Sequence, residues 1–187
     1  MNLREAILNR RSIRQYNDKE IKREEIIELL NDAVYAPTHH FRQTWRFIYI
    51  DGEEKNKVLS NMDKIYEGLD PIEWKLEYRK ATIDEAKAIL IVVNEKDHPD
   101  PVWLLEEYGA ASALIQNFQL LAYERGIGVC WRSHFFLGEQ GRFLGLKDNE
   151  MLTGVLTLGY FDKTPSAVER IKVEEKFTVL KFDESLL

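Results

Sequence analysis

Two apolar runs, the first of them uninterrupted, constrain the fold of this chain more than any other feature. One is AILIVV at residues 88–93, and the other is MLTGVLTLGYF at residues 151–161. A strand that is covered on both faces needs apolar side chains at every position rather than at alternate positions. The first run therefore predicts a central strand and the second another strong strand, although periodicity alone does not distinguish such a run from a buried helix.

Helical patterns surround these runs. Asn2 can cap a first helix that ends at a group of arginines, and residues 22–35 repeat apolar positions at helical spacing until Pro37 limits them. The longest predicted helix spans 103–125 and ends at Gly126. The shorter predicted elements are strands at 45–50 and 127–131, helices at 53–69 and 71–82, and a helical turn at 139–145.

Size and composition indicate one globular domain. The chain has 187 residues, of which 44% are hydrophobic and 31% charged, and its net charge is −6. This acidic balance argues against a nucleic-acid partner, because a duplex binder needs a broad basic face. No apolar segment reaches the length of a membrane span, and the N-terminus lacks a signal-peptide pattern, so we expect a cytoplasmic protein with no membrane partner. The single cysteine, Cys130, fits a reducing compartment.

The strongest local exception to the acidic composition is the sequence RRSIR at residues 10–14. Guanidinium groups bind phosphates and ring carbonyls through planar, charge-assisted hydrogen bonds, and a serine hydroxyl adds a donor. This chemistry suits a phosphorylated cofactor. The alternative interpretation is that the arginines complement the negative end of the first helix.

Other motifs point less strongly to a function. The chain has no Walker loop, and Gly126-Ile127-Gly128 lacks the context of a dinucleotide fingerprint. The pair His39-His40 has no partners at metal-ligand spacing, so no metal site is predicted. Cys130 has a histidine four residues later, but its apolar surroundings favour a buried small side chain over a thiol nucleophile.

Four segments together resemble the FMN-dependent nitroreductase family. They are RRSIR at 10–14, APTHHFRQTWRF at 36–47, GIGVCWRS at 126–133 and TGVLTLGYFDKTPSAVER at 153–170. The pattern is most similar to the compact YdjA-like branch. The resemblance implies an α+β fold with a mostly antiparallel central sheet flanked by helices. It also implies a homodimer with FMN at the subunit interface, in which residues 1–187 form one domain and 171–187 a C-terminal arm exchanged between subunits.

The resemblance implies that five of the site residues bind the charged and polar parts of FMN. Arg10 and Ser12 would contact the phosphate and ribityl groups, with Arg11 in the same loop. Arg14 would face the pyrimidine edge of the flavin, where positive charge stabilises the reduced, anionic ring. Arg170 resembles a late arginine that helps neutralise the phosphate.

The remaining implied site residues surround the flavin ring. His39 matches a loop that reaches the flavin from the partner subunit. Trp131, Arg132 and Ser133 match a segment alongside the isoalloxazine. The chain departs from the family where the common Q-P-W has Thr44 in place of proline, and where Tyr35 replaces an arginine, so Tyr35 is not included in the site.

The family covers its substrate face where the variable helices at 53–82 fall, with Tyr66, Trp74 and Tyr78. The resemblance implies an oxidoreductase that takes hydride from NADH or NADPH and reduces a small conjugated acceptor, such as a nitroaromatic or a quinone, by a ping-pong mechanism. No side chain is expected to act as a catalytic acid, base or nucleophile, because the flavin carries the redox chemistry. The alternatives are a non-catalytic flavin-binding or ligand-sensing module, and an arginine patch that docks an acidic protein.

Overall fold

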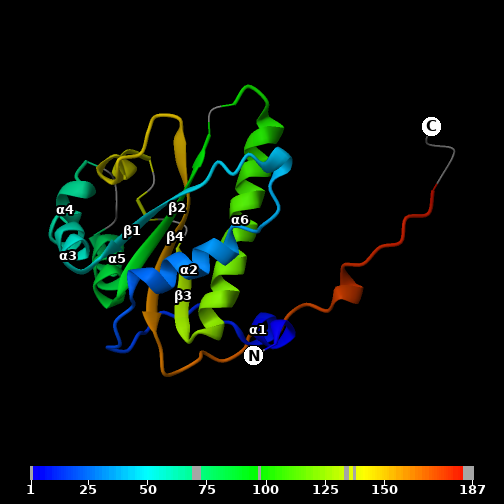
Figure 1. Ribbon diagram of the computed structural model, residues 1–187, viewed down its shortest axis with the longest axis horizontal. Coiled ribbons are helices and arrows are strands. Elements are labelled where there is room, and N and C mark those ends of the chain that lie inside the picture. The colour runs from blue at the N-terminus through cyan, green and yellow to red at the C-terminus, as the bar shows by residue number, and fades with distance from the viewer. Residues whose placement is uncertain (1, 69–72, 97, 133–134, 137, 183–187) are drawn as a thin grey trace.

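A four-stranded antiparallel sheet forms the centre of the protein (Figure 1). The computed structural model describes residues 2–68, 73–96, 98–132, 135–136 and 138–182, without the side chains of 73, 74 and 138–140. The strands are β1 (Arg46–Asp51), β2 (Ala88–Glu95), β3 (Ile127–Arg132) and β4 (Glu150–Tyr160). They lie in the order β1-β2-β4-β3, and every neighbouring pair is antiparallel.

Strand β2 is buried on both faces, as its sequence predicts. Leu90 and Val92 pack into one hydrophobic cluster, whereas Ile89 and Ile91 pack into a second cluster on the opposite face. All four side chains are inaccessible to solvent. The uninterrupted apolar run is therefore a consequence of having a layer of helices on each side of the sheet.

The helices divide between the two faces (Figure 1). Helices α2 (Arg23–Ala33) and α6 (Pro101–Glu124) cover the first cluster. The second cluster is covered by α3 (Gly52–Ser60), α4 (Met62–Ile65) and α5 (Glu73–Glu85). The remaining helical elements are α1 (Leu3–Asn9) and the 3₁₀ turns η1 (His39–Phe41), η2 (Gly138–Leu144) and η3 (Val173–Glu175).

Local capping explains where two helices begin. The Asn2 side chain accepts from the N–H of Glu5 at 2.9 Å, and the Glu5 carboxylate accepts from the N–H of Asn2 at 3.0 Å, which confirms the predicted cap. Helix α6 begins two residues before the expected position, because the Asp100 side chain caps it and Pro101 occupies its first turn.

Strand β4 is longer than β3, which leaves a step in the sheet. β3 pairs with residues 155–160 of β4, and β4 continues to Glu150 without β3 beside it. A bulge places Val92 opposite Gly154 and Val93 opposite Leu152, so Thr153 is the extra residue of β4. Bulges of this kind redirect side chains, and this one lies beside a pocket described below.

The chain beyond β4 leaves the body of the protein as an extended tail (red in Figure 1). Its only regular element among the described residues is η3. Its large hydrophobic side chains are exposed, namely Val168, Ile171, Val173, Phe177, Val179, Leu180 and Phe182. In the described part of the chain, no helix is both long and apolar enough to cross a membrane.

Candidate functional site

The arginine-rich segment lies along the outer edge of β3. The N–H of Ile13 donates to the carbonyl of Val129 at 3.1 Å, and Ser12 forms a parallel bridge with Val129. Ile13 is buried, whereas Ser12 and Arg14 are exposed. An anchored backbone therefore presents Ser12 and Arg14 to solvent on either side of a buried isoleucine.

Two paired glycines allow this segment to lie so close to the sheet. A Cβ atom at Gly128 would lie 2.6 Å from the Cβ of Ile13, and one at Gly159 would collide with the ring of Tyr16. The Tyr16 hydroxyl also donates to the sheet at the carbonyl of Thr157, at 2.9 Å. The position of the arginines thus depends on the absence of two side chains in β3 and β4.

Positive charge accumulates at one end of this segment. Burial lowers the pKa of Arg10, and the nearby charges of Arg11 and Arg170 lower it further. Among the described residues, no carboxylate forms an ion pair with Arg10, Arg14 or Arg170. The fold thus brings arginines from both ends of the chain together without a balancing protein anion, which suits an anionic ligand.

Arg11 differs from its neighbours because the backbone already engages it. Its Nη1 donates to the carbonyls of Leu8 and Arg10, at 2.8 Å in each case. Arg11 therefore shapes the end of α1 and contributes charge to the site. Ser133, the last residue of the predicted W-R-S segment, lies outside the described residues.

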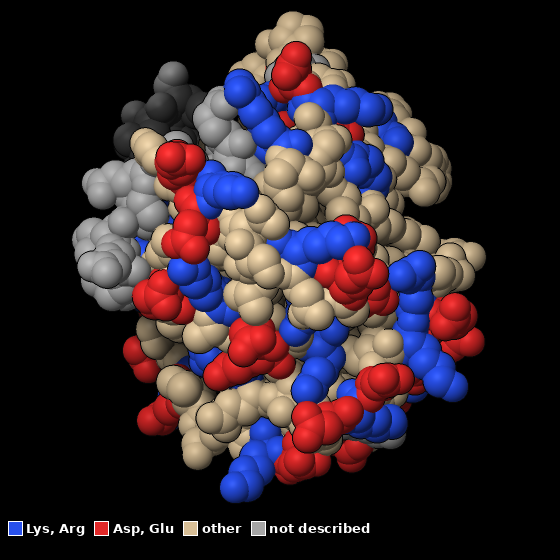
Figure 2. Space-filling model, turned by 90° about the vertical axis from the view of Figure 1, so that its left-hand side faces the viewer, with Lys and Arg blue, Asp and Glu red and all other residues tan. Residues whose placement is uncertain are grey.

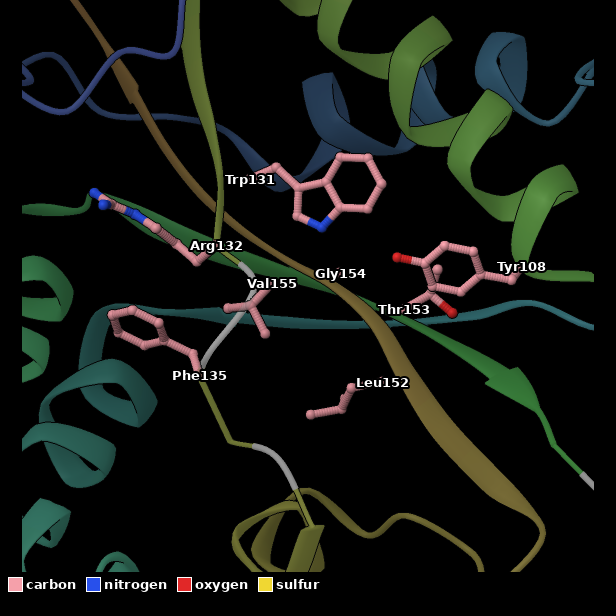
Figure 3. Close-up of a pocket in the computed structure, with 8 residues that line it drawn as sticks. All are labelled: Tyr108, Trp131, Arg132, Phe135, Leu152, Thr153, Gly154 and Val155. Carbon is pink, nitrogen blue, oxygen red and sulfur yellow. The ribbon is translucent and has the colours of Figure 1, made fainter. Parts of the chain in front are cut away.

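A pocket of about 370 Å³ opens at the step where β3 ends (Figure 3). Trp131 and Arg132 lie at the end of β3, Tyr108 projects from α6, and Phe135 follows β3. The floor is formed by residues 152–155 of β4. Gly154 gives the Trp131 indole room, because a Cβ there would lie 2.9 Å from the indole nitrogen. The pocket therefore combines aromatic walls with a guanidinium group.

Polar atoms in this pocket are incompletely paired. Arg132 Nη1 donates to the Tyr78 hydroxyl at 2.7 Å, but its Nε is buried and has no hydrogen-bond partner among the described residues. The Thr153 hydroxyl is likewise buried and has no hydrogen-bond partner among the described residues. Two buried polar atoms without partners thus belong to residues that line one cavity, where they are available to a polar ligand.

The tyrosines of the variable helices have different roles. Tyr78 is half exposed and contacts Arg132, as expected of a residue on the substrate face. Tyr66, in contrast, is buried, and its hydroxyl accepts from the N–H of Phe136, so it belongs to the core. The expectation that Tyr66 covers the substrate face is not met, because the apolar side of α4 packs on the sheet. The side chain of Trp74 lies outside the described residues.

The loop that carries His39 lies at a distance from the arginine cluster of the same chain. His39 Nδ1 is 3.8 Å from Glu106 Oε1, near the beginning of α6, whereas α1 lies by the other end of that helix (Figure 1). His39 is exposed, and His40, Phe41 and Gln43 have positive φ angles of 50°, 55° and 48°. One copy of the chain does not bring His39 and Arg10 together.

Other candidate sites find little support in the described residues. Lysines, arginines and acidic side chains are interspersed over the face that carries α3, α4 and α5, with no continuous basic patch (Figure 2). No group of three or more His, Cys, Asp and Glu residues is arranged for metal binding within the described chain. Cys130 is buried, as predicted for a small core residue.

Fold and site together define an α+β protein with a cationic cluster at the edge of an antiparallel sheet. The Nitroreductase family matches residues 7–160. YfhC of Bacillus subtilis, provisionally named an NAD(P)H nitroreductase, is 35% identical over 181 residues, covering 94% of this chain and 93% of YfhC. A crystal structure of a nitroreductase-like family protein from Bacillus cereus superposes with a TM-score of 0.86 at 31% identity, covering 97% of both chains.

This chain belongs to the nitroreductase family, and its α+β fold with an antiparallel sheet is that of the family. The family resemblance stated from four motifs is therefore confirmed. YdjA of Escherichia coli is 26% identical over 165 residues, covering 85% of this chain and 88% of YdjA. Because that identity is lower than the identity to YfhC, the YdjA-like branch is not singled out.

Sequence reasoning overlooked several residues that shape the site. Tyr108 lies within the long helix predicted at 103–125 and was not singled out as a site residue, but it is 44% exposed and lines the pocket. Thr153 and Gly154 lie in a motif that carried the resemblance, yet only the bulge in β4 shows how they contribute. Glu107 was also overlooked. The sequence offered one weak indication of its burial, because it lies four residues before Ala111 and therefore on the same buried face of α6.

Proposed function

We propose that this protein is a cytoplasmic, homodimeric, FMN-dependent oxidoreductase that oxidises NADH or NADPH and reduces a small conjugated acceptor by a ping-pong mechanism. The observation that carries the proposal is that Arg10, beside the edge of β3, lies close enough to Arg11 and Arg170 to be affected by their charges. Membership of the nitroreductase family and the provisional name of YfhC support the same reaction class.

The residues present fit a phosphorylated flavin. Arg10 would bind the phosphate dianion, Arg170 would help neutralise it, and the exposed Ser12 hydroxyl would donate a hydrogen bond to it. Burial and then the charges of Arg11 and Arg170 lower the pKa of Arg10, and a bound anion would offset both effects. The bridge between Ser12 and Val129 is parallel, so the two segments run in the same direction. Arg14, two residues after Ser12, therefore lies toward the end of β3, where Trp131 follows Val129 by the same two residues. Its charge would there face the pyrimidine edge of the ring.

The pocket at the end of β3 fits the planar part of the cofactor and its substrates. Bound FMN supplies the redox chemistry, accepting hydride from the nicotinamide nucleotide and returning reducing equivalents to the acceptor. Trp131, Tyr108 and Phe135 provide aromatic surfaces for stacking. Arg132 and Thr153 offer unpaired polar atoms for ring or substrate oxygens. The protein binds, orients and shields the reactants, and none of these side chains needs to transfer a proton.

The homodimer and its exchanged arm are a further part of the proposal, with residues 1–187 as one domain and 171–187 as the arm. The large apolar side chains of the tail remain 65–82% exposed in one copy, although ordering such a segment costs conformational entropy. A receptor is available at the other side of the sheet, where the outer edge of β1 has no strand beside it among the described residues. A pocket of about 310 Å³ between α2 and β1 adjoins that edge and is lined by Ile27, Val34 and Phe47.

The spectrum of the isolated protein tests the cofactor. We expect yellow protein with flavin absorption, and stopped-flow measurements without oxygen should show flavin reduction by NADH or NADPH before any acceptor is added. Subsequent addition of a quinone or nitroaromatic should reoxidise it. Flavin that neither nucleotide reduces would instead support a non-catalytic flavin-binding module, and colourless protein that binds no FMN would contradict the proposal.

Deletion of residues 171–187 tests the arm. We expect the dimer to dissociate in sedimentation velocity, because the deletion removes six of the exposed apolar side chains of the tail. A matched control replaces Val168, which precedes the arm, with alanine and should remain dimeric. A truncated protein that sediments as the wild-type dimer would remove the arm from the interface.

A further inference from the structure

Glu107 is the most deeply buried charged residue in the described chain outside the proposed cofactor site, with no solvent-accessible surface. It lies on α6, facing the loop between α2 and β1. Oε1 accepts from Arg42 Nε at 2.5 Å, and Oε2 accepts a short hydrogen bond from the Thr44 hydroxyl. Its backbone carbonyl accepts from Asn94 Nδ2 of β2 at 2.8 Å. A buried carboxylate with so complete a set of partners fixes the geometry of those partners.

The loop that Glu107 holds is strained. Backbone φ angles of 50°, 55° and 48° at His40, Phe41 and Gln43 are unfavourable for residues with a Cβ atom. Such conformations persist only where surrounding contacts determine them, and they concentrate at functional sites. Arg42 and Thr44, whose side chains donate to the Glu107 carboxylate, flank Gln43 directly.

A second layer of contacts joins this loop to the beginning of α6. Arg42 Nη2 donates to Glu106 Oε2 at 2.5 Å, and its guanidinium lies 4.8 Å from the centre of the Trp103 ring. The hydrogen bond from Arg42 lowers the pKa of Glu106. The far carboxylate oxygen of Glu106 is 3.8 Å from His39 Nδ1. A continuous path of polar contacts therefore leads from the buried Glu107 to His39.

The loop exposes apolar surface that one copy of the chain does not use. Phe41 is 84% exposed and Tyr35 is 88% exposed, although both are large aromatic residues. An isolated copy gains nothing from holding the Phe41 ring outward on a strained backbone. Contacts between this loop and a second copy would bury the exposed aromatic surface and offset the cost of the strained backbone.

We propose that Glu107, together with Arg42 and Thr44, is a positioning unit that holds the loop of residues 38–44 in the conformation in which His39 meets the cofactor of the partner subunit. This inference rests on the proposed function. None of the three residues needs to touch the cofactor, because they act through the backbone of the loop. Loss of the unit should weaken FMN binding at the site of the partner rather than at the arginine cluster of its own chain.

The first test compares two buried ion pairs. Glu107→Gln keeps the shape of the side chain but removes one acceptor and the charge, and we expect FMN to bind about tenfold more weakly. Glu150→Gln is the matched control, because Glu150 is also buried and binds Arg46 at 2.6 and 2.7 Å without contacting the loop. It should lower thermal stability and leave FMN affinity unchanged. If both variants lose affinity equally, or if neither does, Glu107 has no positioning role.

A milder variant covers the possibility that Glu107→Gln does not fold. Thr44→Val preserves the shape of the side chain and removes one hydrogen bond to Glu107, and we expect FMN to bind about two- to fivefold more weakly. The far-ultraviolet circular dichroism should match that of the wild type. Wild-type affinity in folded Thr44→Val protein would contradict the inference.

The decisive test uses mixed dimers, because it separates action on the partner from damage to the fold. One subunit carries Glu107→Gln and the other carries Arg10→Ala, and differently tagged copies are co-expressed and purified together. If Glu107 acts on the partner, one site receives both defects and the other receives none, so the mixed dimer binds one FMN with wild-type affinity. If each defect affects only its own chain, both sites are weakened and no wild-type site remains, which would overturn the inference.

These outcomes remain distinct from a failure of the proposed function. Wild-type protein that binds no FMN, or that is monomeric when FMN is bound, contradicts the proposed homodimeric flavoenzyme before any variant is measured. Wild-type dimer that binds FMN, combined with unaltered binding by Glu107→Gln and Thr44→Val, contradicts only the positioning unit.

Discussion

Two groups of arginines in this protein differ in how their charge is balanced. Arg42 and Arg46 each bind a buried carboxylate, Glu107 and Glu150 respectively, with nitrogen–oxygen distances of 2.5–2.7 Å. Arg10, at the edge of β3, faces other cations instead, and no ion pair with a described carboxylate balances it. The net charge of the chain is −6, so carboxylates are abundant and the difference lies in where the fold places them.

The difference separates structural from functional charge. A buried carboxylate must be paired, because leaving it alone in the interior is costly, and the paired arginines accordingly hold loops and strands in place. Clustered cations raise the energy of the free protein, and an anionic ligand recovers that energy on binding. Substitution of Arg10 is thus expected to weaken ligand binding, whereas substitution of Arg46 is expected to lower the stability of the fold.

The largest effect is expected from Arg10→Ala. Loss of a charge-assisted hydrogen bond to phosphate costs about 1.5–3 kcal/mol, which corresponds to roughly 10- to 150-fold weaker FMN binding. Fluorescence titration of apo-protein with FMN measures the change. Arg4→Ala, on the exposed side of α1, serves as the control and should bind FMN as the wild type does. Equal affinities for both variants would remove Arg10 from the site.

Gly128→Ala tests whether the unpaired arginines depend on the close approach of their backbone to β3. The added Cβ would lie 2.6 Å from Ile13, so we expect unfolding to require about 1–3 kcal/mol less free energy and FMN to bind more weakly. Urea denaturation and FMN titration measure the two effects. Gly109→Ala in α6 is the matched control, because no atom lies within 4 Å of its added Cβ. A stable Gly128→Ala protein with full affinity would contradict the proposed dependence.

Acid should remove the stabilisation that the Arg46–Glu150 ion pair provides. Arg46 lowers the pKa of Glu150 to about 2, from an ordinary value of 4.5. Because the pKa is lower in the folded state, the stabilisation is complete above pH 4.5 and is lost as the pH falls toward 2. We expect the free energy of unfolding to fall by about 1–2 kcal/mol, a range that allows for solvent screening at the partly exposed Arg46. Urea denaturation measures how much the free energy of unfolding falls between pH 5 and pH 3, and this fall should be smaller in Glu150→Gln than in the wild type. An equal fall in both proteins would show that Glu150 does not contribute to the acid sensitivity.

Arg170→Ala should have the smallest effect on the unpaired cluster. Arg170 is exposed, so its contribution to FMN binding is about 0.2–1 kcal/mol, or at most roughly fivefold in affinity. The effect should shrink when the ionic strength is raised, because salt screens exposed charges. Titrations at low and high salt test this, and a loss as large as that of Arg10→Ala at both would show that Arg170 binds the phosphate as directly as Arg10.

Prediction from sequence succeeded where local pattern decides the structure. The capped first helix, the central strand at 88–93 and the burial of Cys130 all follow from residue type and spacing, and the structure confirms them. It failed where packing decides. Tyr66 and Tyr78 look alike in a charged helical stretch, yet one lies in the core and the other contacts Arg132.

The chain by itself determined which segments become strands and helices, because hydrophobic periodicity and capping act over a few residues. It also placed the RRSIR motif at the end of a helix. Only the tertiary structure brought Arg170 next to Arg10, paired Glu107 with Arg42 and left Thr153 at a bulge beside the pocket. These arrangements join residues far apart in sequence, and they depend on sheet register and close packing, which no local pattern encodes.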